Sequence, residues 1–531
     1  MKRTCLTLLL SAATIIPCYS QALMKPGMTA VTSYAISGDL GIAIDDYVLT
    51  VYDIRPFQSS SIGNNFPAAM LRPTPPADNQ WKRSRMGSVF GVTSDTVGNI
   101  YVAAGNPYDM QAVGTAGMGG IYKVKWDDWT VSDLVTTINA PSGVSATQIP
   151  NTGCGLGNIG YDKWHDRLFV TNFEDGKVYN ITPTGAVIGS FDPFTPDNQA
   201  TSSADYGEIV WGVDAYGHNT TDVRVYFARW LNNGSGLNST EIWSVALDAA
   251  GNFTGTEQLE FQVMEVSPGN GSMPVSDISF SDDGRMLLTE RTMIAPNSPS
   301  AHLSRLLEYQ YVNNAWVLRE YYYTGNYGGH KNTAGGGDYG YSLYDATADT
   351  VDGCQEMVWA TGDALKFGGY NYDNSYDYIY GMTGISIQGN SNSASDPDFV
   401  CTTSYFVDLN NDITDIPKMY IGALDILNDC RATAPPPPPP TPTPVTPPCE
   451  IALPNIVTAN GDGINDFFII PCPGEWKLEI YNRWGNKIYT SNFYQNDFNG
   501  RDLSDGVYYY ILESPADGKK EGGFFHLIRG N

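Results

Sequence analysis

The 531-residue sequence lacks the short motifs that mark most enzyme and metal sites. It has only five histidines, no Cys-x-x-Cys pair, no Gly-x-Ser-x-Gly elbow, no His-Glu-x-x-His segment and no Walker loop. These absences remove the usual sequence evidence for a zinc centre, a redox dithiol, a serine hydrolase or a nucleoside triphosphatase. Any site must therefore be assembled from residues that are distant in the sequence.

Basic residues are also scarce. The chain has 30 Lys and Arg residues against 57 Asp and Glu, a formal net charge of -27 at pH 7. Such a chain repels phosphate backbones and anionic lipids, so nucleic acid is not an expected partner. The acidity is typical of a protein that stays soluble outside a cell, and it favours the binding of divalent cations.

Long apolar segments are missing except at the N-terminus. The basic start Met1-Lys2-Arg3 is followed by apolar residues 6–16, and Ser20 and Ala22 are small residues at the positions that precede a signal-peptidase cut. This pattern predicts a secretory signal peptide over residues 1–22. The apolar run is too short to cross a bilayer, and no later segment is long enough for a transmembrane helix. We therefore expect an exported, soluble mature chain.

Cysteine usage agrees with export. Cys5 and Cys18 lie in the predicted signal peptide, and the other cysteines are even in number. An even number is typical of disulfides in an oxidising compartment. These remaining residues are Cys154, Cys354, Cys401, Cys430, Cys449 and Cys472.

A proline-rich segment divides the chain. Residues 432–448, ATAPPPPPPTPTPVTPP, can form neither a helix nor a sheet ladder, because proline lacks the backbone donor and has a fixed φ. The segment predicts a stiff spacer. It separates a body of residues 23–431 from a compact tail of residues 449–531.

The body repeats one pattern: an apolar strand, an Asp, a turn and an aromatic-aliphatic strand, as in VFGVTSDTVGNIYVA from Val89 and ISFSDDGRMLLT from Ile278. Further strands such as GGIYKVKW follow, which gives four antiparallel strands per unit, the construction of a β-propeller blade. We expect about six blades, with strands in residues 41–54 and 405–427 combined in a shared closing blade. An array of β-sandwiches is the alternative. The body resembles the broad class of extracellular six-bladed propellers, which names no substrate.

The tail is predicted to be a small antiparallel β-sandwich, with Cys449 and Cys472 expected as a disulfide. Its segments PNIVTANGDGINDFF, IYNRWGNKIY, DLSDGVYYY and GFFHLIRGN resemble the gliding motility-associated C-terminal domain, the type B sorting domain of type IX secretion in Bacteroidota. The resemblance implies that the type IX secretion machinery recognises the folded tail. The protein would then pass through the periplasm to the cell surface or the medium. A sorting signal does not determine the function of the body.

The first of these segments contains a candidate calcium site. The side chains of Asn460, Asp462 and Asp466 and the carbonyl of Ile464 could present hard oxygen ligands around a tight bend, as calcium requires. The spacing differs from that of an EF-hand, since Pro471 stands where its bidentate Glu would fall. Alternatively, the two Gly steps simply make turns whose carboxylates cap backbone amides.

The body has a second set of candidate ligands. Polar residues precede or begin several predicted first strands of blades, which line the channel of a propeller: Asn158, Glu208, Asp277 and Glu356. Converging oxygen ligands could hold a divalent cation that polarises a carbonyl, a placement similar to that in six-bladed metal-dependent lactonases. Acidic residues beside strands also simply solvate turns. The stretch GGHKNTAGGGDYGYS from Gly328 is interpreted as a long surface connection.

The sequence thus favours a secreted or surface-displayed propeller that acts as a binding or adhesion module for a glycan or protein ligand, rather than an enzyme. The alternative is a metal-dependent extracellular hydrolase or lactonase that uses the four channel residues.

Overall fold

The computed structural model describes two compact units, which meet in the sequence between Pro439 and Pro440. The described residues of the body are 24–34, 47–74, 77–107, 112–139, 147–194, 204–231, 240–263, 272–295, 298–327, 329–367, 377–390, 402–414, 420–428 and 430. Those of the tail are 453–460, 465–470, 476–492, 494, 496–513 and 520–529. The predicted signal peptide, the proline-rich segment and the expected Cys449–Cys472 pair lie outside these residues.

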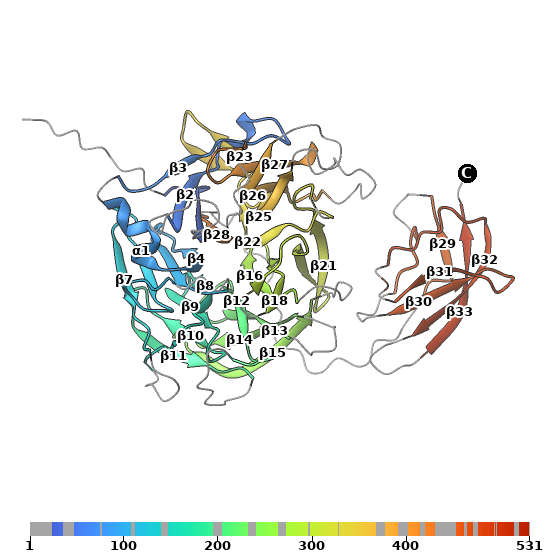
Figure 1. Cartoon of the computed structure of the whole chain (residues 1–531). Helices are drawn as coiled ribbons and strands as arrows, with labels where there is room; N and C mark the ends of the chain where they lie inside the picture. Colours follow the sequence, from blue (N-terminus) through green and yellow to red (C-terminus); the bar gives the residue numbers. More distant parts are fainter. Residues whose placement is uncertain are drawn as a thin grey trace, which may run out of the picture. The chain divides into compact units, whose positions relative to one another are not determined.

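The described part of the body contains six four-stranded antiparallel sheets, the blades of a β-propeller (Figure 1). In each of blades 2, 3 and 4, the four strands follow one another along the chain. They are β4 (Val89–Ser94), β5 (Ile100–Ala104), β6 (Ile121–Val124) and β7 (Val131–Val135); β8 (Leu156–Asp162), β9 (Arg167–Asn172), β10 (Val178–Ile181) and β11 (Val187–Phe191); and β12 (Val210–Tyr216), β13 (Arg224–Trp230), β14 (Thr240–Leu247) and β15 (Phe253–Gln262).

Blades 5 and 6 carry extra hairpins. Blade 5 is β16 (Val275–Phe280), β17 (Arg285–Glu290), β20 (Leu306–Val312) and β21 (Ala315–Tyr322), with the hairpin β18 (Met293–Ala295) and β19 (Ser298–Pro299) inserted. Blade 6 is β22 (Thr333–Gly340), β25 (Met357–Phe367), β26 (Tyr378–Ser386) and β27 (Ser404–Asp408), with the hairpin β23 (Leu343–Asp345) and β24 (Thr350–Asp352). The glycine-rich stretch that we interpreted as a surface connection is therefore largely the inner strand β22.

Blade 1 closes the ring with strands from both ends of the body. Its inner strand is β28 (Tyr420–Ile426), and the other three are β1 (Thr29–Tyr34), β2 (Leu49–Asp53) and β3 (Ala69–Leu71). β28 pairs antiparallel with β1, where Thr29 lies opposite Ile426. The predicted shared closing blade is present, although β27 belongs to blade 6 rather than to it.

The inner strands β4, β8, β12, β16, β22 and β28 each contact the next one around the ring. Figure 1 shows them around the centre, with outer strands such as β7, β11, β15 and β21 at the rim. Apolar side chains fill the space between neighbouring blades; Tyr101 and Ile121 of blade 2, for example, pack with Ile159 and Val170 of blade 3. This burial between sheets is the main hydrophobic stabilisation of the body.

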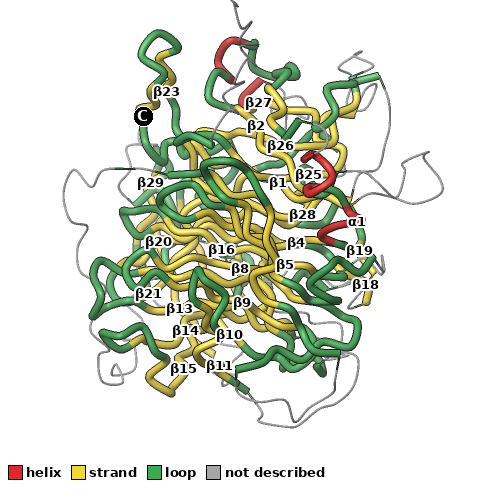
Figure 2. Tube along the Cα trace, turned by 90° about the vertical axis from the view of Figure 1, so that its left-hand side faces the viewer, coloured by secondary structure: helices red, strands yellow, loops and turns green. Residues whose placement is uncertain are grey.

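The named helical segments of the described residues are short: η1 (Phe57–Ser59), η2 (Ala77–Trp81) and α1 (Arg83–Met86). Figure 2 shows the body from the side, with strands crossing it and helix only in small red segments. No helix in the described residues is long and apolar enough to cross a membrane.

Glycines let the inner strands approach one another closely. A Cβ atom added to Gly336 would lie 2.4 Å from the Cα of Ala423, and one added to Gly160 would lie 2.8 Å from the Cα of Asp214. These short contacts would be with backbone atoms, which cannot shift without a large cost in folding free energy. Gly91, Gly212 and Gly422 make similarly close approaches to the neighbouring inner strand.

Aromatic rings fill the centre of the ring of strands. Phe90 of β4 and Trp211 of β12 are fully buried, with ring centroids 5.1 Å apart, although β8 lies between their strands in the ring. From the other side, a Cβ on Gly335 of β22 would lie 3.1 Å from the Phe90 ring. Phe90 thus reaches across the axis, and this aromatic layer closes the channel.

The described tail is one five-stranded sheet, in the order β29 (Ile456–Thr458), β33 (Lys520–Ile528), β32 (Gly506–Glu513), β30 (Lys477–Tyr481) and β31 (Lys487–Ser491). Only β29 pairs parallel, with β33. Phe468, Ile470, Tyr494 and Phe498 lie outside the strands and pack on the buried side chains of the sheet. The second layer of the tail is therefore irregular in the residues described.

One disulfide ties the end of the closing strand to blade 6. Cys354, just before β25, bonds to Cys430, just after β28, with Cα atoms 5.9 Å apart. Cys154 has a free thiol. Cys401 lies outside the described residues.

We expect Gly336→Ala to destabilise the body by about 1–3 kcal/mol or more, because its methyl group would overlap the backbone of Ala423. Gly189→Ala in the outer strand β11 is the matched control, since its added Cβ meets no atom within 4 Å. Denaturant unfolding of the purified chain measures both changes. Equal stabilities for the two variants would contradict the close packing of the inner strands.

Loss of the disulfide should lower the stability of the body by about 4.5 kcal/mol, the loop-closure value for the 76-residue separation of Cys354 and Cys430. The measurement is thermal unfolding of the Cys354→Ser/Cys430→Ser variant. Cys154→Ser is the control for loss of a thiol alone. An unchanged melting temperature in the double variant would show that the crosslink does not hold the closing strand.

Candidate functional site

A cavity of about 450 Å³ lies at one end of the propeller axis, where the inner strands end. Its walls come from the last residues of β4, β8, β12, β16 and β28, with Asp338 of β22 and the turns that follow these strands. The aromatic layer of Phe90 and Trp211 lies further along the same strands. The cavity therefore has the size of a small-ligand pocket and is closed toward the channel.

Four aspartates on successive inner strands line the cavity: Asp214, Asp277, Asp338 and Asp425. Each follows a small or aliphatic residue in its strand, as in Gly-Val-Asp at residues 212–214 and Ala-Leu-Asp at residues 423–425. Because all the inner strands run in the same sense, equivalent positions meet at the same end of the axis. We refer to these four residues as the acidic floor.

Hydrogen bonds within the acidic floor join different blades. Asn158 of blade 3 donates its Nδ2 to Asp277 Oδ1 of blade 5 at 2.8 Å, and the N–H of Gly337 in blade 6 donates to Asp277 Oδ2 at 2.9 Å. The N–H of Ile426 in blade 1 donates to Asp338 Oδ2 at 2.8 Å. These bonds place Asn158 and Asp277 against each other and hold the ring of strands together.

Asp425 is bound in the same way on its other side. Ser94 Oγ of blade 2 donates to Asp425 Oδ2 at 2.5 Å, and Thr93 Oγ1 lies 3.5 Å from Oδ1. Asp214 accepts a hydrogen bond from the N–H of Ala215, at 2.8 Å to Oδ1. All the donors to the acidic floor are thus neutral groups.

Burial changes the protonation of the acidic floor. It raises the pKa of Asp214, Asp277 and Asp338 well above the usual value, and repulsion from Asp425 adds to the effect at each of them. Burial also raises the pKa of Asp425 to about 7, outweighing the hydrogen bonds from Ser94 and Thr93. Desolvation disfavours the charged carboxylate, which is the physical cause of all four shifts.

The rim of the cavity is aromatic. Tyr216 and Phe280 stack with centroids 4.7 Å apart, and Trp164 is held by a 2.7 Å hydrogen bond from its Nε1 to the carbonyl of Gly217. Lys163 Nζ lies 3.0 Å from Asp282 Oδ1, an ion pair that joins blade 3 to blade 5 past blade 4. All of these side chains line the cavity except Gly217, which contributes backbone.

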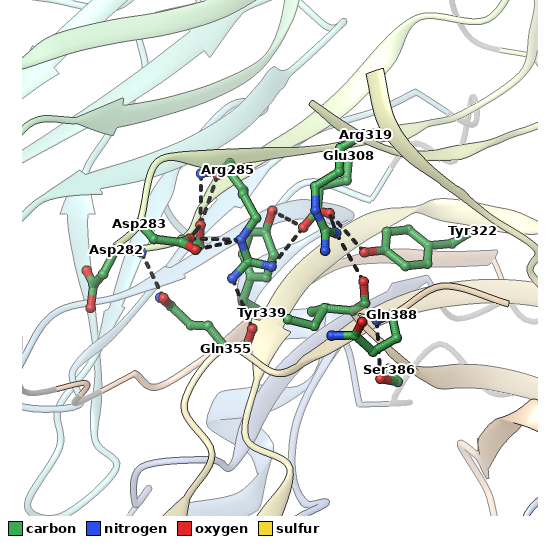
Figure 3. A network of polar contacts seen from close by, with 12 residues as sticks. Asp282, Asp283, Arg285, Glu308, Arg319, Tyr322, Tyr339, Gln355, Ser386 and Gln388 are labelled. Atoms are coloured by element: carbon green, nitrogen blue, oxygen red, sulfur yellow. Dashed lines mark hydrogen bonds and ion pairs between the residues drawn. The ribbon is translucent and has the colours of Figure 1, made fainter. Parts of the chain in front are cut away.

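A buried polar network fixes the rim on blades 5 and 6 (Figure 3). Glu308 is fully buried and accepts hydrogen bonds from Tyr339 at 2.9 Å and Tyr322 at 3.1 Å. Its carboxylate also pairs with Arg285, at 3.1 Å, and with Arg319. A buried charge with this many partners is well satisfied, so the network is rigid.

The same network reaches the cavity through Arg285. Its Nε donates to Asp283 at 2.8 Å and its terminal nitrogen to the carbonyl of Gln355 at 3.2 Å. The Gln355 side chain in turn accepts the N–H of Asp282 at 2.8 Å (Figure 3). The turn between β16 and β17 is thereby attached to blade 6, which positions Asp282 and Gln355 at the rim.

The structure brings together two of the four predicted channel ligands. Asn158 and Asp277 are in contact, whereas Glu208 precedes β12, at the opposite end of that strand from Asp214. Glu356 precedes β25, the second strand of its blade, and accepts a hydrogen bond from Ser342. Its predicted place on a first strand is wrong because residues 333–340 form that strand. The sequence reading missed Asp214, Asp338 and Asp425, whose signal was an Asp near the end of each inner strand.

Among the described residues, no group of three or more His, Cys, Asp or Glu side chains could hold a metal ion. In the predicted calcium loop of the tail, Asp462 and Ile464 lie outside the described residues. Asn460 and Asp466 are described, and the N–H of Thr458 donates to the carbonyl of Asn465 at 2.7 Å. Calcium binding by this loop stays a prediction.

The tail has a known relative. Residues 451–527 match the CHU_C Type IX secretion signal domain. The tail is a type IX secretion signal. It implies interaction with the type IX secretion machinery and export to the cell surface or the outside. The resemblance seen in the sequence is therefore confirmed, while the signal domain by itself says nothing of what the propeller binds.

Several solved structures are similar to the chain at low identity. PorZ, an essential surface component of the type IX secretion system of Porphyromonas gingivalis, is 12% identical with a TM-score of 0.32; 92% of this chain and 64% of that one are covered. This chain thus spans less than two thirds of PorZ. An α-L-arabinanase of Cellvibrio cellulosa is 12% identical with a TM-score of 0.28, covering 51% and 88% of the two chains. A glucose dehydrogenase is 13% identical with a TM-score of 0.31, covering 65% and 96%. No activity carries over from such scores, and no curated protein matches the chain.

The acidic floor predicts an unusual pH dependence of stability. The folded state keeps a proton on Asp425 up to about pH 7, whereas the unfolded chain loses it near 3.8. Stability from this group is therefore full below about pH 4 and is lost as the pH rises to about 7, by an amount on the order of a few kcal/mol; the other three acids act in the same direction.

We expect the melting temperature of the body to fall between about pH 4 and pH 7. Asp425→Asn should remove much of that fall, since an amide keeps an acceptor for Ser94 without the charge. Thermal unfolding at several pH values measures this. Glu257→Gln, on the exposed outer strand β15, is the acid-to-amide control. Parallel curves for wild type and Asp425→Asn would contradict the assignment.

Proposed function

We propose that the exported propeller is a binding or adhesion module that takes its ligand in the cavity at the end of the axis. The observation that carries the proposal is the cavity itself, which is open at its rim. Six blades contribute to its walls, the aromatic layer closes it on one side, and its rim combines Trp164, Tyr216 and Phe280 with polar groups. A concave site with aromatic walls and a few fixed polar groups is typical of small-ligand recognition.

The polar groups of the cavity are positioned as fixed acceptors. Asp277 and Asp338 are held by backbone N–H groups of the next blade, so their oxygens keep one orientation. Preorganised acceptors of this kind favour binding because little ordering is needed when the ligand arrives. The ion pair of Lys163 and Asp282 at the rim fixes a further pair of groups.

His165, close to the cavity, does not suit general base catalysis. Both ring nitrogens of His165 are engaged, Nδ1 with Asp162 Oδ2 at 2.5 Å and Nε2 with the carbonyl of Thr220 at 3.0 Å. The side chain stabilises the turn after β8 and is not part of the cavity wall, whereas His218 lines the cavity.

A metal-dependent hydrolase or lactonase is the second candidate. The observation in its favour is the contact of Asn158 with Asp277 at the channel end, although the described acids form no group of three that could hold a metal ion. A bound divalent cation would there polarise a carbonyl group of a substrate.

The test is ligand binding by the purified full chain and by Trp164→Ala. Trp164 is 39% exposed and lines the cavity, so its loss should weaken binding about tenfold through the lost ring contact. Trp126→Ala is the matched control, because Trp126 is 42% exposed but lies outside the cavity. Panels of soluble oligosaccharides and peptides, followed by tryptophan fluorescence, provide the ligands.

Two results would overturn this proposal. One is binding that Trp164→Ala leaves unchanged, which would place the ligand elsewhere. The other is turnover of ester or lactone substrates that Asp277→Asn abolishes, which would favour the hydrolase.

A further inference from the structure

The cavity contains far more negative than positive groups. Its lining includes seven aspartates, one lysine and one histidine: Asp95, Asp162, Asp214, Asp277, Asp282, Asp338, Asp425, Lys163 and His218. Lys163 is already paired with Asp282. Two tyrosines of the lining, Tyr161 and Tyr216, have pKa values raised first by burial and then by nearby aspartates, so they stay neutral. The charge of the cavity is therefore set by its aspartates.

The acidic floor has no cationic partner. None of its four carboxyl groups takes part in an ion pair within the described residues. Asp277 and Asp338 are each only 8% exposed. Buried carboxyl groups without a cationic partner stay protonated, because desolvation of an isolated charge is costly. The described residues supply no cation that would stabilise the ionised form of this floor, so a bound cation would do so.

One acceptor of the acidic floor remains open to a ligand. Asp214 accepts its hydrogen bond from Ala215 at Oδ1, which leaves Oδ2 without a donor in the described residues. This oxygen is an acceptor, so it would pair with a ligand that donates a hydrogen bond.

The walls suit the same ligand. The negative faces of aromatic rings attract cations, and Trp164, Tyr161 and the stacked Tyr216 and Phe280 surround the approach to the floor. The acceptors come from several different strands rather than from one compact group. A group with several N–H donors that point in different directions can satisfy such separated acceptors.

We infer that the ligand presents an organic cation to the acidic floor: an ammonium or guanidinium group on a small amine, or on a lysine or arginine side chain of a partner. This inference rests on the proposed binding function. The cation would stabilise the ionised floor, donate to Asp214, and lie between the aromatic walls. A cavity of about 450 Å³ accommodates the end of such a side chain or a small amine.

Binding should strengthen as the pH rises from 5 to 8. Burial raises the pKa of Asp425 to about 7, so the floor gains negative charge over this range. Bound cation in turn favours the ionised floor, and protons are released on binding.

The experiment is calorimetric titration of the full chain with N-acetyl-lysine amide and N-acetyl-arginine amide, against N-acetyl-norleucine amide as the neutral analogue. We expect at least one cationic probe to bind at least tenfold more tightly than the neutral one at pH 8, and to weaken at least tenfold at pH 5. Agmatine and a short Lys/Arg peptide form two further arms. Tighter binding of agmatine assigns the cation to a small amine, and tighter binding of the peptide assigns it to a partner side chain.

Asp214→Asn should reduce cation affinity at least tenfold, whereas the control Glu257→Gln should not change it. Its melting temperature shows whether the variant is folded. Asp338→Asn is the second variant if Asp214→Asn fails to fold.

Each other outcome overturns the inference. If the cationic probes bind no better than the neutral one but another ligand binds in a manner that depends on Trp164, the charge inference falls and the proposed function stands. If no ligand depends on Trp164, both fall. If calcium chloride alone binds with one site that Asp214→Asn removes, the floor holds a metal ion instead.

Discussion

The close approach of the inner strands at the axis is the constraint on which the rest of the body depends. Glycines such as Gly336 and Gly160 allow backbone-to-backbone contacts that no other residue would permit. With the strands this close, one aromatic layer around Phe90 suffices to close the channel. The same closeness brings the strand ends together, and so it produces the cavity and the acidic floor.

The acidic floor shows how this geometry affects stability. Buried carboxyl groups disfavour folding at neutral pH, because desolvation penalises their charge. Hydrogen bonds from Asn158, Gly337 and Ile426 offset part of this cost and join the blades. Acids with strongly raised pKa values are frequent at functional sites, which agrees with the ligand site that we propose.

The secretion signal and the propeller belong to separate units of the chain. The type IX secretion signal of residues 451–527 has its own core, in which Phe468 and Phe498 pack on the sheet. The propeller has a different core between its blades and is closed by its own first and last strands. The disulfide of Cys354 and Cys430 ends the body just after the closing strand. Export can therefore be specified without any change at the cavity.

The sequence by itself determined the features that depend on neighbouring residues. The strand-turn-strand units, the proline-rich segment and the segments of the secretion signal are all local, so their patterns predicted the blades and the destination. Only the tertiary structure decided the site. Residues 333–340 look like a loop because glycines have low strand propensity, yet contacts with β16 and β28 make them an inner strand. Asp214, Asp338 and Asp425 lie far apart in the sequence, and ring closure alone places them in one cavity.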